Sequence, residues 1–394
     1  MRLGAFLIVL AAALTAWGIG RDRVRSLAPS PTAPAVGRAA AQPLALPPGG
    51  AAPAAHPAPP RPEGPSSLAP VGSAGTDRPL FPGRPRQLVS GGCCTGAWWS
   101  SDGEQLLFVD RPADSPIAAL WGVAAWPPGR PPEVVDANAG APAGSPRFTA
   151  RPAGDFSLIR NLESGEEWPL PTGGDPVLLS PDGQRAVWWD VSGGRADVDG
   201  LISIHGSDAF GRSPHLLTAL WGATVVSFLP DQRRVLAIGR PLDTFPLYAA
   251  VTLDVDSGEM VEIASGLWLA EALLSPDGRW VAYLTSLDRS HPERNGIWVA
   301  PIEGAAHDTP RKMDFVGAYR WRRGGQLLYV PMSTSDATDS IWQYDAATGT
   351  SVRLVGPEAG MRIAGNDWVV SPDGASIAWL DAADRNLWLI DLPR

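Results

Sequence analysis

The sequence holds only two cysteines and five histidines among 394 residues. The cysteines, Cys93 and Cys94, are adjacent, so the chain has neither a Cys-x-x-Cys motif nor a separate resolving thiol for a redox role. The histidines show no paired spacing along the chain. The sequence therefore supports neither a zinc site nor histidine-based catalysis, and we expect no metal and no cofactor.

Clusters of positive charge are also missing. The net charge is -9, and the sequence contains no block rich in lysine or arginine. Proteins that bind nucleic acid rely on basic patches to neutralise phosphates. Nucleic acid is therefore excluded as an expected partner.

The N-terminal end differs from the rest of the chain. Residues 3–20 form an apolar run after Met1 and Arg2, near the minimum length for crossing a bilayer and long for the core of a signal peptide. We expect residues 1–25 to be an uncleaved signal anchor of a single-pass cell-membrane protein. The alternative is a cleaved signal peptide and a secreted protein. Three arginines follow the run and one precedes it, which leaves its orientation open, although the next segment favours export.

Residues 26–85 are dominated by alanine and proline and cannot bury a core. We expect a disordered to polyproline-like tether that lifts a folded domain away from a membrane surface. Residues 86–394 then remain for folding, which suits a single repeat domain. Many of the 17 tryptophans lie in this part, where large rings can fill the space between packed sheets.

A turn and its flanking strands recur along residues 86–394. The clearest copy is Ser275-Pro276-Asp277-Gly278, followed by the β-forming stretch 280–284 and, after a polar loop, by 296–300. Aligned on the turn aspartate, successive copies lie 49, 46, 47 and 49 residues apart from Asp182 onward. A fixed period of this length is typical of four-stranded propeller blades. The sequence therefore predicts an all-β propeller that is monomeric.

The first step, from Asp102 to Asp182, covers 80 residues and is too long for one blade. Residues 156–162 and 167–170 resemble the outer half of an additional blade, with 146–150 as its inner strand, so seven blades are favoured over six. The last copy ends after its third strand, and residues 87–91 resemble the end of a fourth strand. We therefore expect the N-terminal strand to complete the C-terminal blade, which removes exposed sheet edges.

These turns and strands resemble the TolB-type, WD-like propeller repeats, whose mark is a Trp-Ser-Pro-Asp-Gly turn followed by Ile-Ala-Phe-like and Ile-Trp-like strands. The resemblance covers about residues 86–394 and is specific for the fold, not for function. It implies an extracytoplasmic binding or scaffolding domain, or blades that precede a serine hydrolase domain. No Gly-x-Ser-x-Gly elbow occurs, which excludes an intact oligopeptidase-type enzyme on this chain alone.

In a propeller, the loops that lead from an outer strand to the next inner strand open on one face, here called the loop face. The recurrent turns lie on the opposite face, here called the turn face. The loop face is the candidate binding surface, and tryptophans with a few fixed charges are common at interfaces. The candidate binding residues are Asp175, Trp221, Trp268, Glu271, Asp367 and Trp368. The competing interpretation is that the tryptophans cap blade cores and the acids are solvated.

Two other features have an ordinary interpretation beside a functional one. Cys93 and Cys94 can close a vicinal disulfide that stiffens the loop before the first inner strand, or remain two free small residues. Asp190, Asp197 and Asp199 occupy a glycine-rich loop, but their spacing is not that of an EF-hand. We interpret this loop as a solvated turn and not as a calcium site.

The leading hypothesis is a membrane-tethered, extracytoplasmic propeller that binds a protein or small ligand on its loop face and catalyses nothing. One alternative is a propeller enzyme of the lyase, lactonase or glycosidase type, with carboxylates such as Asp175, Glu271 and Asp367 in the central tunnel. The other alternative is a receptor or sensor subunit of a membrane complex.

Overall fold

The computed structural model describes residues 84–90, 95–110, 118–127, 129–136, 141–190, 200–243, 246–303, 310–332 and 338–393. The chain divides into two units, Met1–Leu68 and Ala69–Arg394, and all described residues belong to the second. The expected signal anchor, nearly all of the expected tether, the Cys93–Cys94 pair, Asp197 and Asp199 lie outside the described residues. Among the residues that are described, no helix is long and apolar enough to cross a membrane.

The recurrent turn is held by a fixed set of hydrogen bonds. Ser275 Oγ donates to Asp277 Oδ1 at 2.6 Å and accepts from the backbone N–H of Trp280 at 2.9 Å. The same aspartate oxygen accepts from the backbone N–H of Arg279 at 3.1 Å. Serine and aspartate therefore satisfy the backbone groups of the turn locally, as short polar side chains do in turns. The same bonds form in the turns that begin at Ser100, Ser180 and Ser371.

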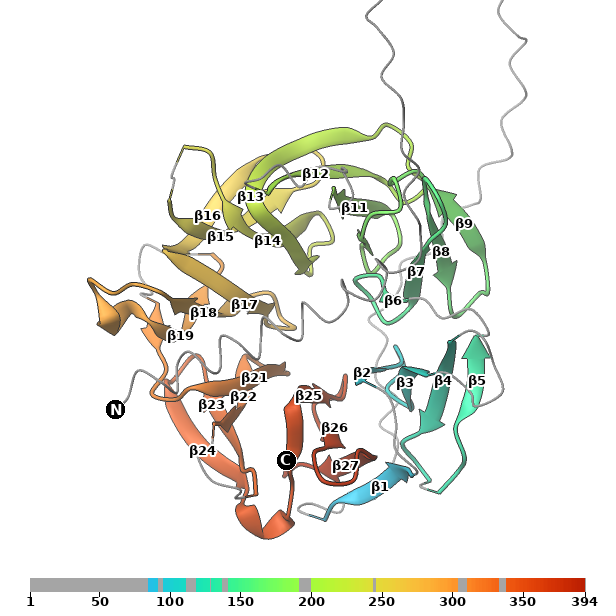
Figure 1. Ribbon diagram of the computed structural model, residues 1–394, viewed down its shortest axis with the longest axis vertical. Coiled ribbons are helices and arrows are strands. Elements are labelled where there is room, and N and C mark those ends of the chain that lie inside the picture. Colours follow the sequence, from blue (N-terminus) through green and yellow to red (C-terminus); the bar gives the residue numbers. More distant parts are fainter. Residues whose placement is uncertain are drawn as a thin grey trace, which may run out of the picture. The chain divides into compact units, whose positions relative to one another are not determined.

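The described strands form six hydrogen-bonded sheets, five with four strands and one with seven, arranged as a propeller-like ring (Figure 1). The first two are β2 (Thr95–Trp99), β3 (Gln105–Asp110), β4 (Ala119–Ala124) and β5 (Glu133–Asp136), and β6 (Ala141–Pro142), β7 (Phe148–Pro152), β8 (Ser157–Asn161) and β9 (Glu167–Leu170). The seven-stranded sheet holds β10 (Val177–Leu179), β11 (Arg185–Trp189), β12 (Leu201–Asp208), β13 (His215–Phe228), β14 (Arg234–Arg240), β15 (Tyr248–Asp254) and β16 (Met260–Gly266).

The remaining sheets continue around the ring. They are β17 (Trp268–Leu274), β18 (Trp280–Ser286), β19 (Gly296–Pro301) and β20 (Arg311–Lys312), then β21 (Gly317–Arg322), β22 (Gln326–Pro331), β23 (Ile341–Asp345) and β24 (Thr350–Val355), and last β25 (Ile363–Val370), β26 (Ser376–Asp381), β27 (Leu387–Asp391) and β1 (Arg86–Val89). Two short 3-10 helices, η1 (Pro292–Arg294) and η2 (Pro357–Ala359), lie in loops. Every pair of neighbouring strands among the described residues is antiparallel, as expected for blades joined by short turns.

Most predicted strands are confirmed within two residues at each end, and one group is corrected. In the long first step, residues 146–150 were expected to be an inner strand, but β7 covers most of them and pairs on both sides, with β6 and β8. The inner strand is the two-residue β6. The turn between them carries Ser145 and Arg147, whose backbone N–H donates to Ser145 Oγ at 3.3 Å, in place of an Asp-Gly pair.

The core lies between neighbouring sheets. Second strands such as β18 and β26 are buried almost throughout because a sheet packs on each of their faces, whereas the outer strand β24 is mostly exposed. One apolar cluster joins Trp280 of β18 to Tyr319 of β21, and its neighbour joins Leu328 of β22 to Trp379 of β26. Tryptophan thus fills the space between sheets, as the composition predicted.

The N-terminal strand completes the last sheet, which confirms the predicted closure. β1 pairs antiparallel with β27, Arg86 opposite Leu389. Arg86 donates both terminal nitrogens to the carboxylate of Asp391, at 2.6 and 3.0 Å, and Ser376 Oγ donates to the same carboxylate at 2.7 Å. Asp391 is fully buried. The first and last parts of the described chain are therefore joined by a bidentate ion pair as well as by backbone hydrogen bonds.

Candidate functional site

An arginine that the sequence analysis did not select occupies the centre of the candidate site. Arg320 lies on the inner strand β21, where its Nη1 donates to the backbone carbonyl of Tyr319 at 2.8 Å and its Nη2 to that of Asn366 at 2.9 Å. Its guanidinium carbon lies 5.4 Å from the ring centroid of Trp368. Burial lowers the pKa of Arg320, and the nearby charges of Glu271 and Asp367 act in the opposite direction.

Glu271, a predicted site residue, lies on the neighbouring inner strand β17. Its φ of +52° is uncommon for a residue other than glycine and coincides with a shift of register between Ala270 and Leu273. The hydroxyl of Tyr319 donates to the backbone carbonyl of Glu271 at 2.7 Å and braces this conformation. Burial raises the pKa of the Glu271 carboxyl and Arg320 opposes the rise, although the residue as a whole remains exposed.

Asp367 approaches Arg320 from the third inner strand, β25. Its two carboxylate oxygens accept from the backbone N–H of Gly96 at 3.2 and 3.3 Å, across the seam between β25 and β2. Burial raises the pKa of Asp367, while the Gly96 hydrogen bond and the charges of Arg385 and Arg320 oppose the rise. Glu271, Arg320 and Asp367, here called the Arg320 cluster, therefore unite groups from three consecutive inner strands.

The other predicted site residues are dispersed. Trp268 is half-buried and packs edge-on against Tyr248, with ring centroids 5.0 Å apart. Trp221 is half-buried in the middle of β13, opposite Leu201 and Arg240. Asp175 is only 6% exposed, and its backbone carbonyl accepts from Ser157 Oγ at 2.9 Å.

The structure corrects the expectation that Trp368 is an exposed rim residue. Trp368 is 1% exposed and belongs to the apolar cluster between the last two sheets. For this residue the competing interpretation, a tryptophan that caps a blade core, describes the structure. Asp175 is likewise buried rather than exposed at a rim.

The signal that identifies Arg320 is present in the repeat itself. Four residues before the turn aspartate, the other copies carry uncharged residues, among them Leu273, Val369 and Ser227, whereas the copy with the decayed turn carries Arg320. A charge at a position that the other copies fill with uncharged side chains marks a departure from a purely structural role. Turns and loops alone do not reveal Arg320, because it lies within a strand.

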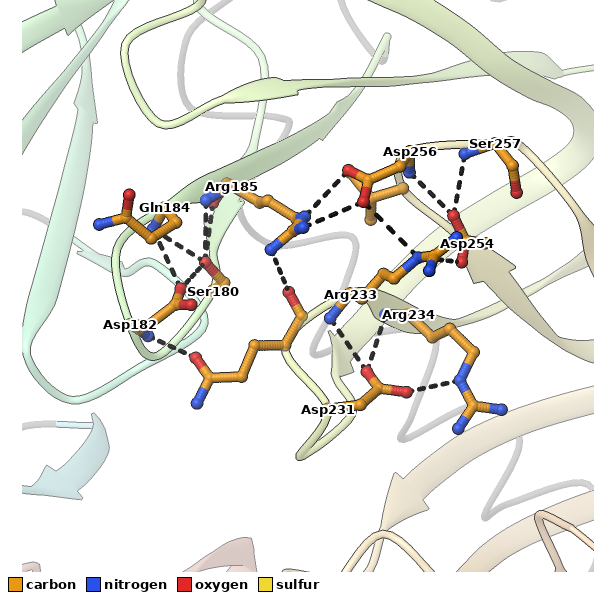
Figure 2. A network of polar contacts seen from close by, with 12 residues as sticks. Ser180, Asp182, Gln184, Arg185, Asp231, Arg233, Arg234, Asp254, Asp256 and Ser257 are labelled. Atoms are coloured by element: carbon orange, nitrogen blue, oxygen red, sulfur yellow. Dashed lines mark hydrogen bonds and ion pairs between the residues drawn. The ribbon is translucent and has the colours of Figure 1, made fainter. Parts of the chain in front are cut away.

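Two clefts lined by described residues lie on the opposite, turn face. One of about 420 Å³ is lined by residues that include Arg185, Asp208, Arg212, His215 and Asp256, and another of about 300 Å³ lies between the turns at Asp231 and Asp277. An ion pair between neighbouring blades borders the larger of these two clefts (Figure 2). Arg185 donates Nε and Nη2 to the two oxygens of Asp256, each at 3.0 Å. Arg233 contacts Asp254 at 2.6 Å, which extends the network along the same face.

In the described part of the chain, no group of three or more histidine, cysteine, aspartate or glutamate side chains is placed to hold a metal ion. Asp190 is described, but the two other aspartates of its loop are not, so the interpretation of that loop as a solvated turn stays a prediction. The vicinal disulfide also stays a prediction.

No protein-family model matches the chain, and no curated protein sequence matches it. Among solved structures, an oligogalacturonate lyase in complex with manganese is similar at a TM-score of 0.52 and 13% identity, over 80% of this chain and 99% of that one. An oligogalacturonate lyase from Vibrio parahaemolyticus has a TM-score of 0.52 and 10% identity, over 80% and 93%. A putative TolB from Agrobacterium tumefaciens has a TM-score of 0.40 and 17% identity, over 67% and 95%.

At these identities the similarity to the two lyases shows the fold alone. TolB proteins are among the similar structures, and membership of that family stays a prediction. Both enzymes and TolB proteins occur among the neighbours of this fold.

Proposed function

We propose that this protein is a non-catalytic binding propeller whose ligand or protein partner docks on the loop face, at the Arg320 cluster. The observation that carries the proposal is the position of Arg320 between Glu271 and Asp367, on three consecutive inner strands. Charged groups brought together from separate strands, one of them at a position where the other repeats carry uncharged side chains, cost stability and serve recognition more readily than folding. Trp268 adds a half-buried aromatic surface on one of the same strands.

The turn face is the less suitable binding surface. Two of its arginines are already paired with acids of the adjoining blade, as at Arg185–Asp256 and Arg234–Glu303. Those pairs match the recurrent turns in position and join one blade to the next. We assign them a structural role.

We also infer that the ring has seven blades. β13 pairs with β12 through its first half, up to Trp221, and with β14 through its second half, from Trp221 onward. The seven-stranded sheet then consists of two four-stranded blades that share one long strand. Together with the five four-stranded sheets, this gives seven.

The N-terminal sequence supports a location for the propeller. We propose that residues 1–25 anchor the chain in the cell membrane and that residues 26–85 tether a monomeric propeller outside the cytoplasm. Protease treatment of intact cells tests this arrangement, because an external propeller is degraded while a cytoplasmic control protein survives. Survival of the propeller would contradict it.

Capture experiments test the binding proposal. The full-length chain, purified in detergent, is presented to extracellular and membrane fractions beside a Glu271→Gln, Asp367→Asn double variant. A matched control carries Glu259→Gln and Glu262→Gln, two exposed acids outside the cluster. The proposal expects a partner that the cluster variant loses and the control variant retains. Equal retention by both variants would refute docking at the Arg320 cluster.

A second candidate function, a propeller enzyme, is favoured by one observation. Glu271 and Asp367 are two carboxyl groups with raised pKa near one arginine, and such groups occur at sites of acid–base chemistry. Because the fold is shared with oligogalacturonate lyases, the first substrate to test is oligogalacturonate with manganese, followed by ultraviolet detection of unsaturated products. The binding proposal expects no turnover above that of the double variant. Turnover abolished by Glu271→Gln would establish the enzyme instead.

A further inference from the structure

The guanidinium of Arg320 has donors to spare. Arginine carries five N–H donors, and two of them reach the backbone carbonyls of Tyr319 and Asn366. In the described part of the chain, Arg320 forms no ion pair within 4.0 Å, although Glu271 and Asp367 are close enough to influence its charge. The cation is thus oriented by the backbone and by the Trp368 ring, but is not neutralised by direct contact.

The fork of a fixed arginine can hold a carboxylate or a phosphate through two parallel N–H donors. The two anions differ in charge, because a phosphate group is largely dianionic near neutral pH whereas a carboxylate is singly charged. Here one arginine is flanked by two carboxylates, which would repel a dianion strongly. A singly charged carboxylate is therefore the better fit.

Glu271 and Asp367 determine which groups of the ligand are favoured beside its carboxylate. Carboxylate oxygens accept hydrogen bonds, so Glu271 and Asp367 favour a ligand with hydroxyl or amino donors next to its acid group. Their positions are fixed by the fold, because Tyr319 braces the backbone of Glu271 and Gly96 holds both oxygens of Asp367. Such preorganisation lowers the entropy cost of binding.

We propose that Arg320 anchors the carboxylate of a hydroxy or amino acid group, while Glu271 and Asp367 accept hydrogen bonds from the donors beside it. This inference rests on the proposed function, since it names the ligand class of the same site. The group can belong to a free small molecule or to the end of a longer chain. Both sources present the same chemistry to the cluster.

Small probes test the inference without any knowledge of the natural partner. The full-length chain, labelled with ¹⁵N-arginine, is titrated with glycolate, glycine, acetate and inorganic phosphate, while the Nε–H signal of Arg320 is followed by NMR. We expect saturable shifts with glycolate and glycine at about three- to tenfold lower concentration than with acetate, as one added hydrogen bond implies. Tighter binding of phosphate than of glycolate, or no saturable shift with any carboxylate, would overturn the inference.

Variants assign the binding to the cluster. Arg320→Lys is expected to weaken glycolate binding at least tenfold because it loses the bidentate fork, and a matched control, Arg353→Gln on the exposed strand β24, is expected to leave it unchanged. Since Arg320→Lys removes the reporting signal, indole N–H signals follow the titration in that variant, and a native thermal transition verifies its fold. Glu271→Gln offers a second readout, because it should weaken glycolate several-fold more than acetate. Unchanged glycolate binding in Arg320→Lys would refute the anchor.

The experiments distinguish failure of the docking proposal from failure of the carboxylate anchor at Arg320. If a partner is lost by the Glu271 and Asp367 double variant but bound equally well by Arg320→Lys, the carboxylate anchor is wrong and the docking face stands. If carboxylate probes bind at Arg320 but no partner depends on the cluster, the anchor stands and the docking proposal is wrong.

Discussion

Gly278 occupies a left-handed backbone conformation, with φ of +70°, and Pro230 of the neighbouring turn packs on the side where a Cβ would project. The final residue of the recurrent turn therefore meets two requirements at once, one conformational and one steric. Glu271 shows the converse, because a glutamate adopts φ of +52° with a tyrosine hydroxyl bracing it. A positive φ costs glycine little, so Gly278 serves a structural turn without strain. The same region strains a glutamate, and Glu271 adopts it at a candidate binding site.

Gly278→Ala is expected to destabilise the propeller by about 2–3 kcal/mol, combining about 1–2 kcal/mol for the left-handed conformation with the displacement of Pro230. A matched control is Gly154→Ala, which has the same φ of +70° and no atom within 4 Å of the added Cβ. Urea unfolding of both variants measures the difference. Equal losses would show that the contact between turns contributes nothing.

Trp368 provides a test of its corrected role. Because its side chain is 1% exposed and packed between sheets, Trp368→Ala should cost about 3–5 kcal/mol of unfolding free energy. The half-buried Trp268, changed in the same way, should cost clearly less. A small loss for Trp368 would restore the original interpretation of a rim residue.

Most of the fold that can be predicted from the sequence is predicted from the hairpins and their turns. The serine, aspartate and glycine of each turn are local signals, so the turns at Ser180, Ser275 and Ser371 and the strands after them could be predicted. The blade of β6 to β9 was only partly predicted because its turn at Ser145 lacks the aspartate and its inner strand has two residues. The charge of Arg320 within a strand repeat is visible in the sequence, but turns and loops alone do not reveal it. That Glu271 and Asp367 lie near it follows only from the assembly of β17, β21 and β25, which no local pattern encodes.

The turn-face ion pairs give the stability a definite pH dependence. The side-chain hydrogen bond from Arg185 lowers the pKa of Asp256, so this pair stabilises the fold above the unfolded pKa of aspartate, about 3.9, and loses that effect as the pH falls through the lower folded pKa. The difference in stability between wild type and Arg185→Gln should therefore be largest near neutrality and vanish in acid. Chemical unfolding at several pH values measures it. A difference independent of pH would contradict an ionic role.

Whereas ionisation of Asp256 raises the stability of the fold, ionisation of Glu271 and Asp367 should lower it. Their folded pKa values are raised, so each carboxyl is most compatible with the fold when protonated and lowers stability as the pH rises through its folded pKa. Glu271→Gln and Asp367→Asn are thus expected to leave stability unchanged or slightly increased at neutral pH. A marked loss would indicate that these acids hold the fold together and would weaken the case for a binding role.

Closure of the ring depends on the pairing of the two ends of the described chain. Repeat sheets bury their faces only against neighbours, so an open ring would leave two sheet faces exposed to water. The single added strand β1 and its ion pair with a fully buried aspartate supply the joint. The cooperative unfolding of the propeller should therefore be sensitive to changes at the β1–β27 joint.

Arg86→Leu is expected to destabilise the propeller by about 3–5 kcal/mol, because it leaves the buried Asp391 carboxylate without its cation. Adding Asp391→Asn should recover part of the loss. The control is Arg147→Leu, whose partner Glu163 is exposed, and it should cost less than about 1 kcal/mol. Similar losses in the two single variants would show that closure does not depend on this pair.

The central claim is that the partner binds the loop face of the propeller and not the turn face. The most direct measurement is the fraction of partner retained by the loop-face variant Glu271→Gln, Asp367→Asn compared with a turn-face variant, Arg212→Gln, Arg279→Gln, whose two arginines line the clefts on that face. We predict that the loop-face variant loses the partner and that the turn-face variant keeps it. Loss confined to the turn-face variant would contradict the account and move the binding site to the clefts between the turns.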